Sequence, residues 1–189
     1  MATGTEQSGP VPVAAGFGTL IVNELEWGEG IFILQNRKNG GRVWEEIEVK
    51  VPASEAWKVY GSLLLAKIVV EGLPSLFSKV EVVEGDGSTG TILHVFFAPG
   101  TVGPSSFKEK FMVDDERRVK ESEVVEGGFL DLGFKLYRFC LEVIEKEGQK
   151  EECIVRGSIE YELKEEAAAN AALVSIEPSL LSCRLLQIT

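Results

Sequence analysis

The sequence predicts an α+β protein with a curved seven-stranded antiparallel sheet, two short helices and a C-terminal helix around a ligand cavity. From residue 42 onward, several segments alternate apolar and polar residues with the period of a strand and are separated by glycine-containing or acidic turns. Two short helical segments follow the first of these strands, and an alanine-rich segment follows the last. A helix placed across the open face of a curved sheet leaves a cleft, so we expect a helix-grip arrangement suited to a small apolar ligand.

The first strand covers residues 42–51, where a valine-rich face alternates with a charged one. The helical segment 55–72 places Trp57 and Tyr60 at helical spacing, and Gly61-Ser62 predicts a break between two short helices. We include Tyr60 among the candidate ligand contacts. Simple core packing is the alternative for both aromatic residues.

A glycine-rich loop, residues 85–91, joins the next two strands. Its glycines permit positive φ and close backbone approach, so its amides could cradle a phosphate. The loop lacks the Lys-Ser/Thr of a nucleotide-binding P-loop and connects two strands, which favours a tight turn. His94 is the single histidine of the chain and has no partner nearby in sequence, so we expect a structural role.

The segment 106–129 reads as a hairpin about the polar turn 114–117 and carries the main chemical signal. Glu109 is the one carboxylate on an otherwise apolar strand face, because alternate residues share a face. On the return strand Lys120 is the basic residue expected to lie nearest to it. The apolar residues that share the face of Glu109 are Phe107, Phe111 and Val113.

Two further strands are predicted at 129–146 and 153–163. Residues 164–187 are helix-prone through their alanine run, although Pro178 interrupts or restarts the helix. On one face of the long strand we expect the side chains of Tyr137, Phe139, Leu141 and Val143.

Composition limits the classes of partner. A net charge of −11 argues against nonspecific binding to nucleic acid or to an anionic membrane. Three cysteines without CxxC spacing predict reduced thiols, with neither a zinc site nor a disulfide framework. No apolar run is long enough to span a bilayer, and the N-terminus has no basic region typical of a secretory signal. We therefore expect a cytoplasmic protein without metal or cofactor, and a nuclear location is also compatible with the sequence.

The chain divides at about residue 40. Residues 1–40 carry small residues, prolines and glycines, and they are compatible with an extra hairpin about Gly28-Glu29-Gly30 or with a disordered extension. Residues 41–189 form the predicted domain. Its final helix is expected to be short, because only 179–189 follow Pro178, and a truncated or alternatively spliced chain would explain this.

Four strings together resemble the Bet v I (pathogenesis-related) family of plants, within the START superfamily, and most of all its norcoclaurine synthase-like subgroup, which includes norbelladine synthase. They are GDGSTGT, FKEKFMVDDERRVK, VEGGFLDLGF and EYELKEE. The resemblance covers roughly residues 42–178. It implies a Pictet–Spengler condensation of an aryl-ethylamine such as dopamine with an aryl aldehyde, as in benzylisoquinoline-type alkaloid biosynthesis.

The resemblance also assigns roles. Lys120 matches the lysine that acts as acid, and Glu109 matches the glutamate that takes a proton from the ring, so these are the predicted catalytic residues. Phe107 stands where the family has a tyrosine, and Phe139 stands where norcoclaurine synthase has an aspartate, so two supporting groups are absent. The predicted ligand contacts are Phe107, Phe111, Phe139, Tyr137, Leu141 and Tyr60.

Two alternatives to the enzyme remain. The first is non-catalytic binding of a small hydrophobic ligand or phytohormone, as in the defence-related and abscisic-acid-binding relatives. A protein phosphatase partner would be expected only under this receptor alternative. The second is a purely structural cross-strand pair, in which Glu109 and Lys120 satisfy each other.

Overall fold

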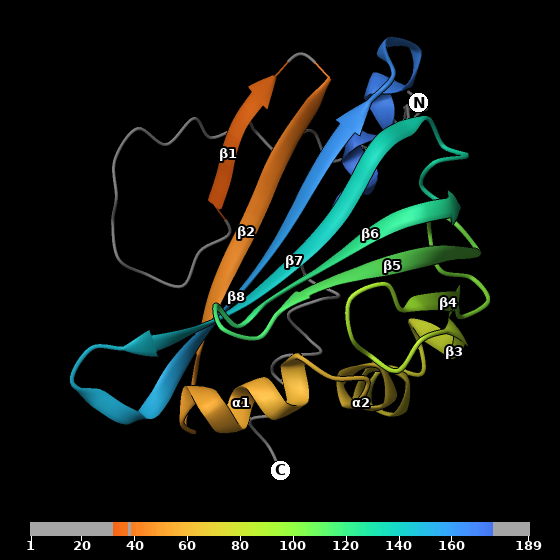
Figure 1. The fold of residues 1–189 in the computed structure, drawn as a ribbon. Helices are drawn as coiled ribbons and strands as arrows, with labels where there is room; N and C mark the ends of the chain where they lie inside the picture. Colours follow the sequence, from red (N-terminus) through yellow and green to blue (C-terminus); the bar gives the residue numbers. More distant parts are fainter. Residues whose placement is uncertain (1–31, 38, 176–189) are drawn as a thin grey trace, which may run out of the picture.

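The structure, a computed structural model, describes residues 32–37 and 39–175. Within these residues, eight strands form one antiparallel sheet in the order β1-β2-β8-β7-β6-β5-β4-β3 (Figure 1). The strands are β1 (Phe32–Arg37), β2 (Gly40–Val49), β3 (Phe77–Glu84), β4 (Ile92–Phe97), β5 (Ser106–Asp114), β6 (Val119–Gly127), β7 (Phe134–Lys146) and β8 (Gln149–Leu163). The seven predicted strands are β2 to β8, and β1 is an additional edge strand that pairs with β2. The hairpin considered about Gly28-Glu29-Gly30 lies outside the described residues.

Two α-helices follow β2, as the sequence predicts: α1 (Ala53–Tyr60) and α2 (Leu64–Gly72). The break between them falls at Gly61-Ser62. Figure 1 shows both helices at one end of the curved sheet, where α1 contacts β7 and β8 and α2 contacts β3. Ala53, Ala56 and Tyr60 of α1 are buried in the main core. None of the described helices is both long and apolar enough to pass through a membrane.

The long strand starts later than predicted. Residues 129–133 are predicted to belong to the strand, but they form a series of tight turns, and β7 begins at Phe134. Backbone hydrogen bonds between residues three apart in sequence join Leu130 N–H to the Gly127 carbonyl and Gly133 N–H to the Leu130 carbonyl. Gly133 has a φ of 87°, a conformation that glycine adopts without steric cost. Phe129, which begins these turns, is buried in the main core.

The alanine-rich segment is helical but tighter than expected. Residues Glu165–Leu173 form the 3₁₀-helix η1, with i→i−3 bonds such as Ala167 N–H to the Lys164 carbonyl. The Asn170 side chain donates to the Leu132 carbonyl at 2.7 Å and ties η1 to the turns before β7. The predicted continuation around Pro178 lies outside the described residues.

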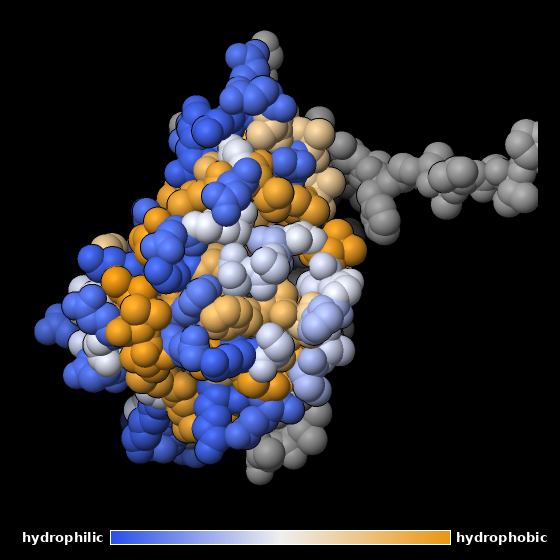
Figure 2. Space-filling model, turned by 90° about the vertical axis from the view of Figure 1, so that its right-hand side faces the viewer, coloured by the Kyte–Doolittle hydropathy of each residue, from blue (hydrophilic) through white to orange (hydrophobic). Residues whose placement is uncertain are grey.

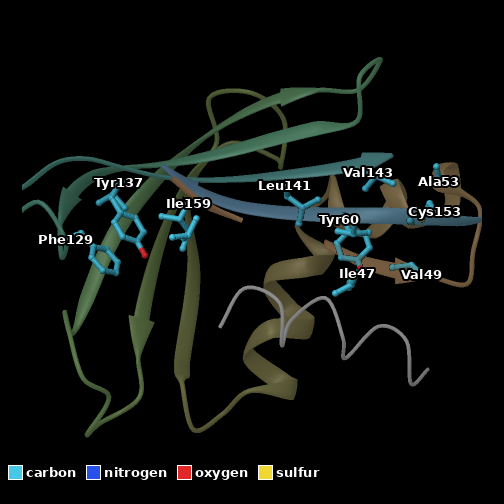
Figure 3. Packing of buried hydrophobic residues seen from close by; sticks show 14 of the residues in the cluster. Ile47, Val49, Ala53, Tyr60, Phe129, Tyr137, Leu141, Val143, Cys153 and Ile159 are labelled. Atoms are coloured by element: carbon cyan, nitrogen blue, oxygen red, sulfur yellow. The ribbon is translucent and has the colours of Figure 1, made fainter. Parts of the chain in front are cut away.

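The core lies between the concave face of the sheet, α1 and the turns before β7. Figure 3 shows Tyr60 at the end of this cluster where Ile47 and Val49 lie, with Phe129 and Tyr137 at the other end. A smaller cluster packs Leu93, Val95 and Phe111 against Leu63 and Ala66 around the start of α2. The space between the two clusters is the part of the concave face that remains unfilled.

Candidate active site

A cavity of about 280 Å³ lies between the concave face of the sheet and α2. Residues of β3 to β8, the loop 101–104 and the end of the described chain at Leu173 and Ser175 complete its wall. Most of the lining is apolar. Its volume is near the lower end of the range for small-molecule sites, which suits a ligand of one or two aromatic rings.

The register of the central strands arranges the cavity floor in rows. One row crosses four neighbouring strands. It consists of Phe111 on β5, Ser122 on β6, Phe139 on β7 and Ile159 on β8. In the next row Lys120 lies between Val113 and Leu141, and on the other side Glu109 pairs with Val124. Glu109 and Lys120 are therefore separated along the hairpin by the row that contains Ser122.

The Lys120 side chain is 6% exposed. Its Nζ donates to the Ser62 carbonyl at 3.0 Å and lies 4.0 Å from the centroid of the Phe111 ring. The break between α1 and α2 supplies this carbonyl, because a residue outside a continuous helix has a backbone oxygen available for a side chain. Burial lowers the pKa of Lys120 to about 8, and the carboxylate of Glu109 opposes that change.

Glu109 follows a β-bulge between Lys108 and Glu109 in the pairing of β5 with β6. Such bulges redirect side chains and are frequent beside active sites. The carboxyl lines the cavity, so it keeps partial exposure to the hollow while protein surrounds it on the other sides. Burial raises the pKa of Glu109 to about 7, and the ammonium of Lys120 opposes that rise.

The two charged groups influence each other without direct contact. Among the ion pairs formed by the described residues, none joins Glu109 to Lys120. The exposed pairs lie elsewhere, as between Lys108 and Glu126 on the outer face of the same hairpin. A carboxyl and an ammonium that face one cavity without neutralising each other are disposed to act on a third molecule, which disfavours the purely structural alternative.

Aromatic rings fill the end of the cavity near Glu109. The Phe107 ring lies 5.7 Å from Phe97 and 5.8 Å from Phe129. Phe129 stacks on Tyr137 with centroids 3.7 Å apart, and Figure 3 shows the two rings side by side. Burial raises the pKa of Tyr137, so its phenol stays neutral and can donate a hydrogen bond.

The cavity brings together all the predicted site residues except Tyr60. Tyr60 is 1% exposed and belongs to the core cluster beside α1. Tyr60 is not among the residues that line this cavity, and its role as a ligand contact stays a prediction. The roles of Lys120 and Glu109 in catalysis, and of the remaining residues in ligand binding, stay predictions. The predicted contacts that line the cavity are Phe107, Phe111, Tyr137, Phe139 and Leu141.

Two parts of the site are not among the residues predicted from the sequence. Ser122 lines the floor, and the alternation that selected Lys120 also places Ser122 on the same face. The loop 101–104 borders the cavity, and no periodic pattern could reveal it.

On the side of the molecule shown in Figure 2, apolar and hydrophilic residues are interspersed.

The glycine-rich loop, by contrast, is a tight turn. Its Asp86 side chain accepts from the Ser88 N–H and hydroxyl, and the Gly87 N–H donates to Thr91 Oγ1 at 2.9 Å. Gly90 N–H bonds the Phe111 carbonyl. These amides are committed to the chain itself, which favours the turn over a phosphate cradle. Within the described part of the chain, no cluster of three or more His, Cys, Asp or Glu is arranged to hold a metal ion.

The chain belongs to the pathogenesis-related protein Bet v 1 family, whose model matches residues 40–176. Among curated relatives, it is 44% identical over 142 residues to norbelladine synthase of Narcissus pseudonarcissus, covering 75% of this chain and 86% of that protein. It is 39% identical over 136 residues to S-norcoclaurine synthase 2 of Papaver somniferum, covering 70% of this chain and 58% of the relative. The chain thus matches little more than half the length of that synthase.

Solved structures agree with this assignment. Truncated norcoclaurine synthase from Thalictrum flavum superposes with a TM-score of 0.70 at 34% identity, covering 81% of this chain and 96% of that one. A second structure of the Thalictrum flavum enzyme, in complex with dopamine and hydroxybenzaldehyde, gives a TM-score of 0.69 at 34% identity, with 82% and 93% covered. The helix-grip fold is therefore confirmed.

Proposed function

We propose that this protein catalyses a norcoclaurine synthase-like Pictet–Spengler condensation of an aryl-ethylamine such as dopamine with an aryl aldehyde, with Lys120 as acid and Glu109 as base. The observation that carries the proposal is that both groups face one cavity without forming an ion pair, with pKa values near 8 and 7. Each is therefore close to the proton affinity that general acid–base catalysis at neutral pH requires. The relatives named as synthases support the same reaction class.

Lys120 serves the first half of the reaction. The amine adds to the aldehyde carbon, and the ammonium donates a proton to the hydroxyl of the resulting carbinolamine. The C–O bond then breaks, water leaves, and the iminium remains. The Ser62 carbonyl accepts a hydrogen bond from the ammonium at 3.0 Å, and the centroid of the Phe111 ring lies 4.0 Å from the same nitrogen. These contacts orient the proton donor towards the cavity.

Glu109 serves the second half. The electron-rich ring of the amine attacks the iminium carbon, so that a C–C bond forms and the ring loses its aromaticity. The carboxylate of Glu109 takes the proton from the attacking ring carbon, and the electrons of that C–H bond restore the aromatic ring. The net reaction joins amine and aldehyde with release of one water. The buried carboxylate is a stronger base than an exposed one because burial raises its pKa.

Incubation of the purified protein with dopamine and 4-hydroxyphenylacetaldehyde tests the proposal by the amount and chirality of the product. We expect one enantiomer in excess, formed faster than the spontaneous reaction. Lys120→Ala should lower the rate by about 100-fold or more, as expected for loss of a general acid, while far-ultraviolet circular dichroism stays unchanged. Lys110→Ala, on the exposed face of the same hairpin, is the matched control and should retain the parent rate. A racemic product at the background rate in the parent protein would refute the enzymatic function.

The second candidate is a non-catalytic carrier or receptor for a small hydrophobic ligand, in the sense of defence-related or hormone-binding relatives. The observation that favours it is the phenylalanine lining, since Phe107 and Phe139 face the cavity where the family resemblance implies a hydroxyl and a carboxylate. Tight binding of an aromatic ligand without turnover by the parent protein would support this candidate over the enzyme.

A further inference from the structure

Ser122 lies at the centre of the cavity floor. It stands opposite Phe111 on β5 and opposite Phe139 on β7, and it is 7% exposed. Along β6 its neighbours on the same face are Lys120 and Val124, and Val124 in turn pairs with Glu109. The serine is therefore the polar residue between the proposed acid and the proposed base, with an aromatic residue on either side.

The hydroxyl of Ser122 has no hydrogen-bond partner among residues 32–37 and 39–175, and it is not one of the polar atoms sealed from solvent. It must therefore reach the hollow of the cavity. Another lining hydroxyl, that of Thr101, already donates to the Ala98 carbonyl at 2.8 Å. An unpartnered hydroxyl on an apolar floor weakens the fold relative to an apolar residue. Its presence is accounted for if a ligand supplies the missing hydrogen bond.

The surroundings define the chemistry of that ligand. A serine hydroxyl both donates and accepts, whereas the Lys120 ammonium can only donate. A flat ring lying along Phe111 and Phe139 would place a ring hydroxyl over Ser122, within the same row of the sheet. We propose that Ser122 is a specificity-determining residue that recognises a phenolic hydroxyl on the aromatic ring of the ligand. This deepens the proposed function and rests on it for the class of ligand, but it requires only binding.

The test measures affinity by isothermal titration calorimetry for 2-phenylethylamine, tyramine and dopamine, which carry none, one and two ring hydroxyls. The parent should bind tyramine and dopamine more tightly than 2-phenylethylamine. Ser122→Ala should weaken binding of the two phenols by about 3- to 10-fold, as expected for one hydrogen bond, and change that of 2-phenylethylamine by less than about twofold. Its thermal midpoint should equal or exceed that of the parent, whereas a structural serine would leave a less stable variant.

Three more variants make the result decisive. Ser122→Cys replaces the hydroxyl by a somewhat larger thiol, which is a weaker donor, and should also lose the preference for phenols. Ser158→Ala, at a buried serine of β8 outside the cavity lining, is the control and should keep that preference. The inference is overturned if Ser122→Ala weakens all three ligands equally, if the preference survives in Ser122→Ala and disappears in Tyr137→Phe, or if the parent binds no probe. Phenol-selective binding through Ser122 in a protein that forms no product would leave this inference standing and refute the proposed reaction.

Discussion

Replacement of Glu109 by glutamine should stabilise the protein in a pH-dependent way. Burial raises the pKa of this carboxyl from 4.5 to about 7. Because a tenfold change in proton affinity corresponds to about 1.4 kcal/mol, ionisation costs the folded chain about 3 kcal/mol more than the unfolded chain. Between pH 4.5 and about pH 7, the folded chain holds a proton on Glu109 that the unfolded chain has released. The stability of the parent relative to the variant is therefore retained below pH 4.5 and lost as the pH rises through 7.

Urea unfolding of the parent and Glu109→Gln at pH 5 and pH 8 measures this difference. The free energy of unfolding of the variant should exceed that of the parent by about 3 kcal/mol at pH 8 and by less than about 1 kcal/mol at pH 5. Glu116→Gln, at the exposed turn of the same hairpin, controls for the loss of one negative charge. An equal difference at both pH values would refute the reasoning, since it would show that water solvates the Glu109 carboxylate in the cavity.

Two further substitutions test the proposed active site and the backbone conformation of the glycine-rich turn. Phe107→Tyr should restore the hydroxyl that the family resemblance implies. We expect turnover to rise by up to about 10-fold, the equivalent of one hydrogen bond. Steady-state kinetics measures the change, and a lower rate would show that the phenylalanine is required. Gly85→Ala should lower the free energy of unfolding by about 2 kcal/mol or more, because φ is +94° and a Cβ would lie 2.7 Å from Thr91 Cα. Gly148→Ala, with φ +77° and no neighbour within 4 Å, is the matched control and should cost less in the same denaturation assay.

Much of the site was predictable because strand alternation fixes which residues share a face. The side chains of Phe107, Glu109 and Phe111 line the cavity as the period-two pattern requires, and so do Tyr137 and Phe139. The resemblance to the Bet v I family then indicated that this face encloses a ligand.

The relation between strands was harder to predict. A hairpin pattern indicates that Lys120 is the basic residue nearest to Glu109, but the turn fixes a register in which Val124 lies opposite Glu109 and Lys120 lies opposite Val113. Turn hydrogen bonds cannot be read from composition, so the sequence pattern predicts a strand through residues 129–133, where the structure has turns. Tyr60 has the spacing of an amphipathic helix residue whether it faces a core or a cavity, so periodicity alone could not separate the two.

The central claim is that Lys120 and Glu109 form an acid–base pair in one cavity, and the pH dependence of turnover tests it most directly. Glu109 must be a carboxylate and Lys120 an ammonium, with pKa values of about 7 and about 8. The rate of formation of the favoured enantiomer, corrected for spontaneous racemic product, should rise through pH 7, reach its maximum near pH 7.5 and fall through pH 8. A rate independent of pH between 6 and 9, or a bell-shaped profile that persists in Lys120→Ala, would contradict the claim.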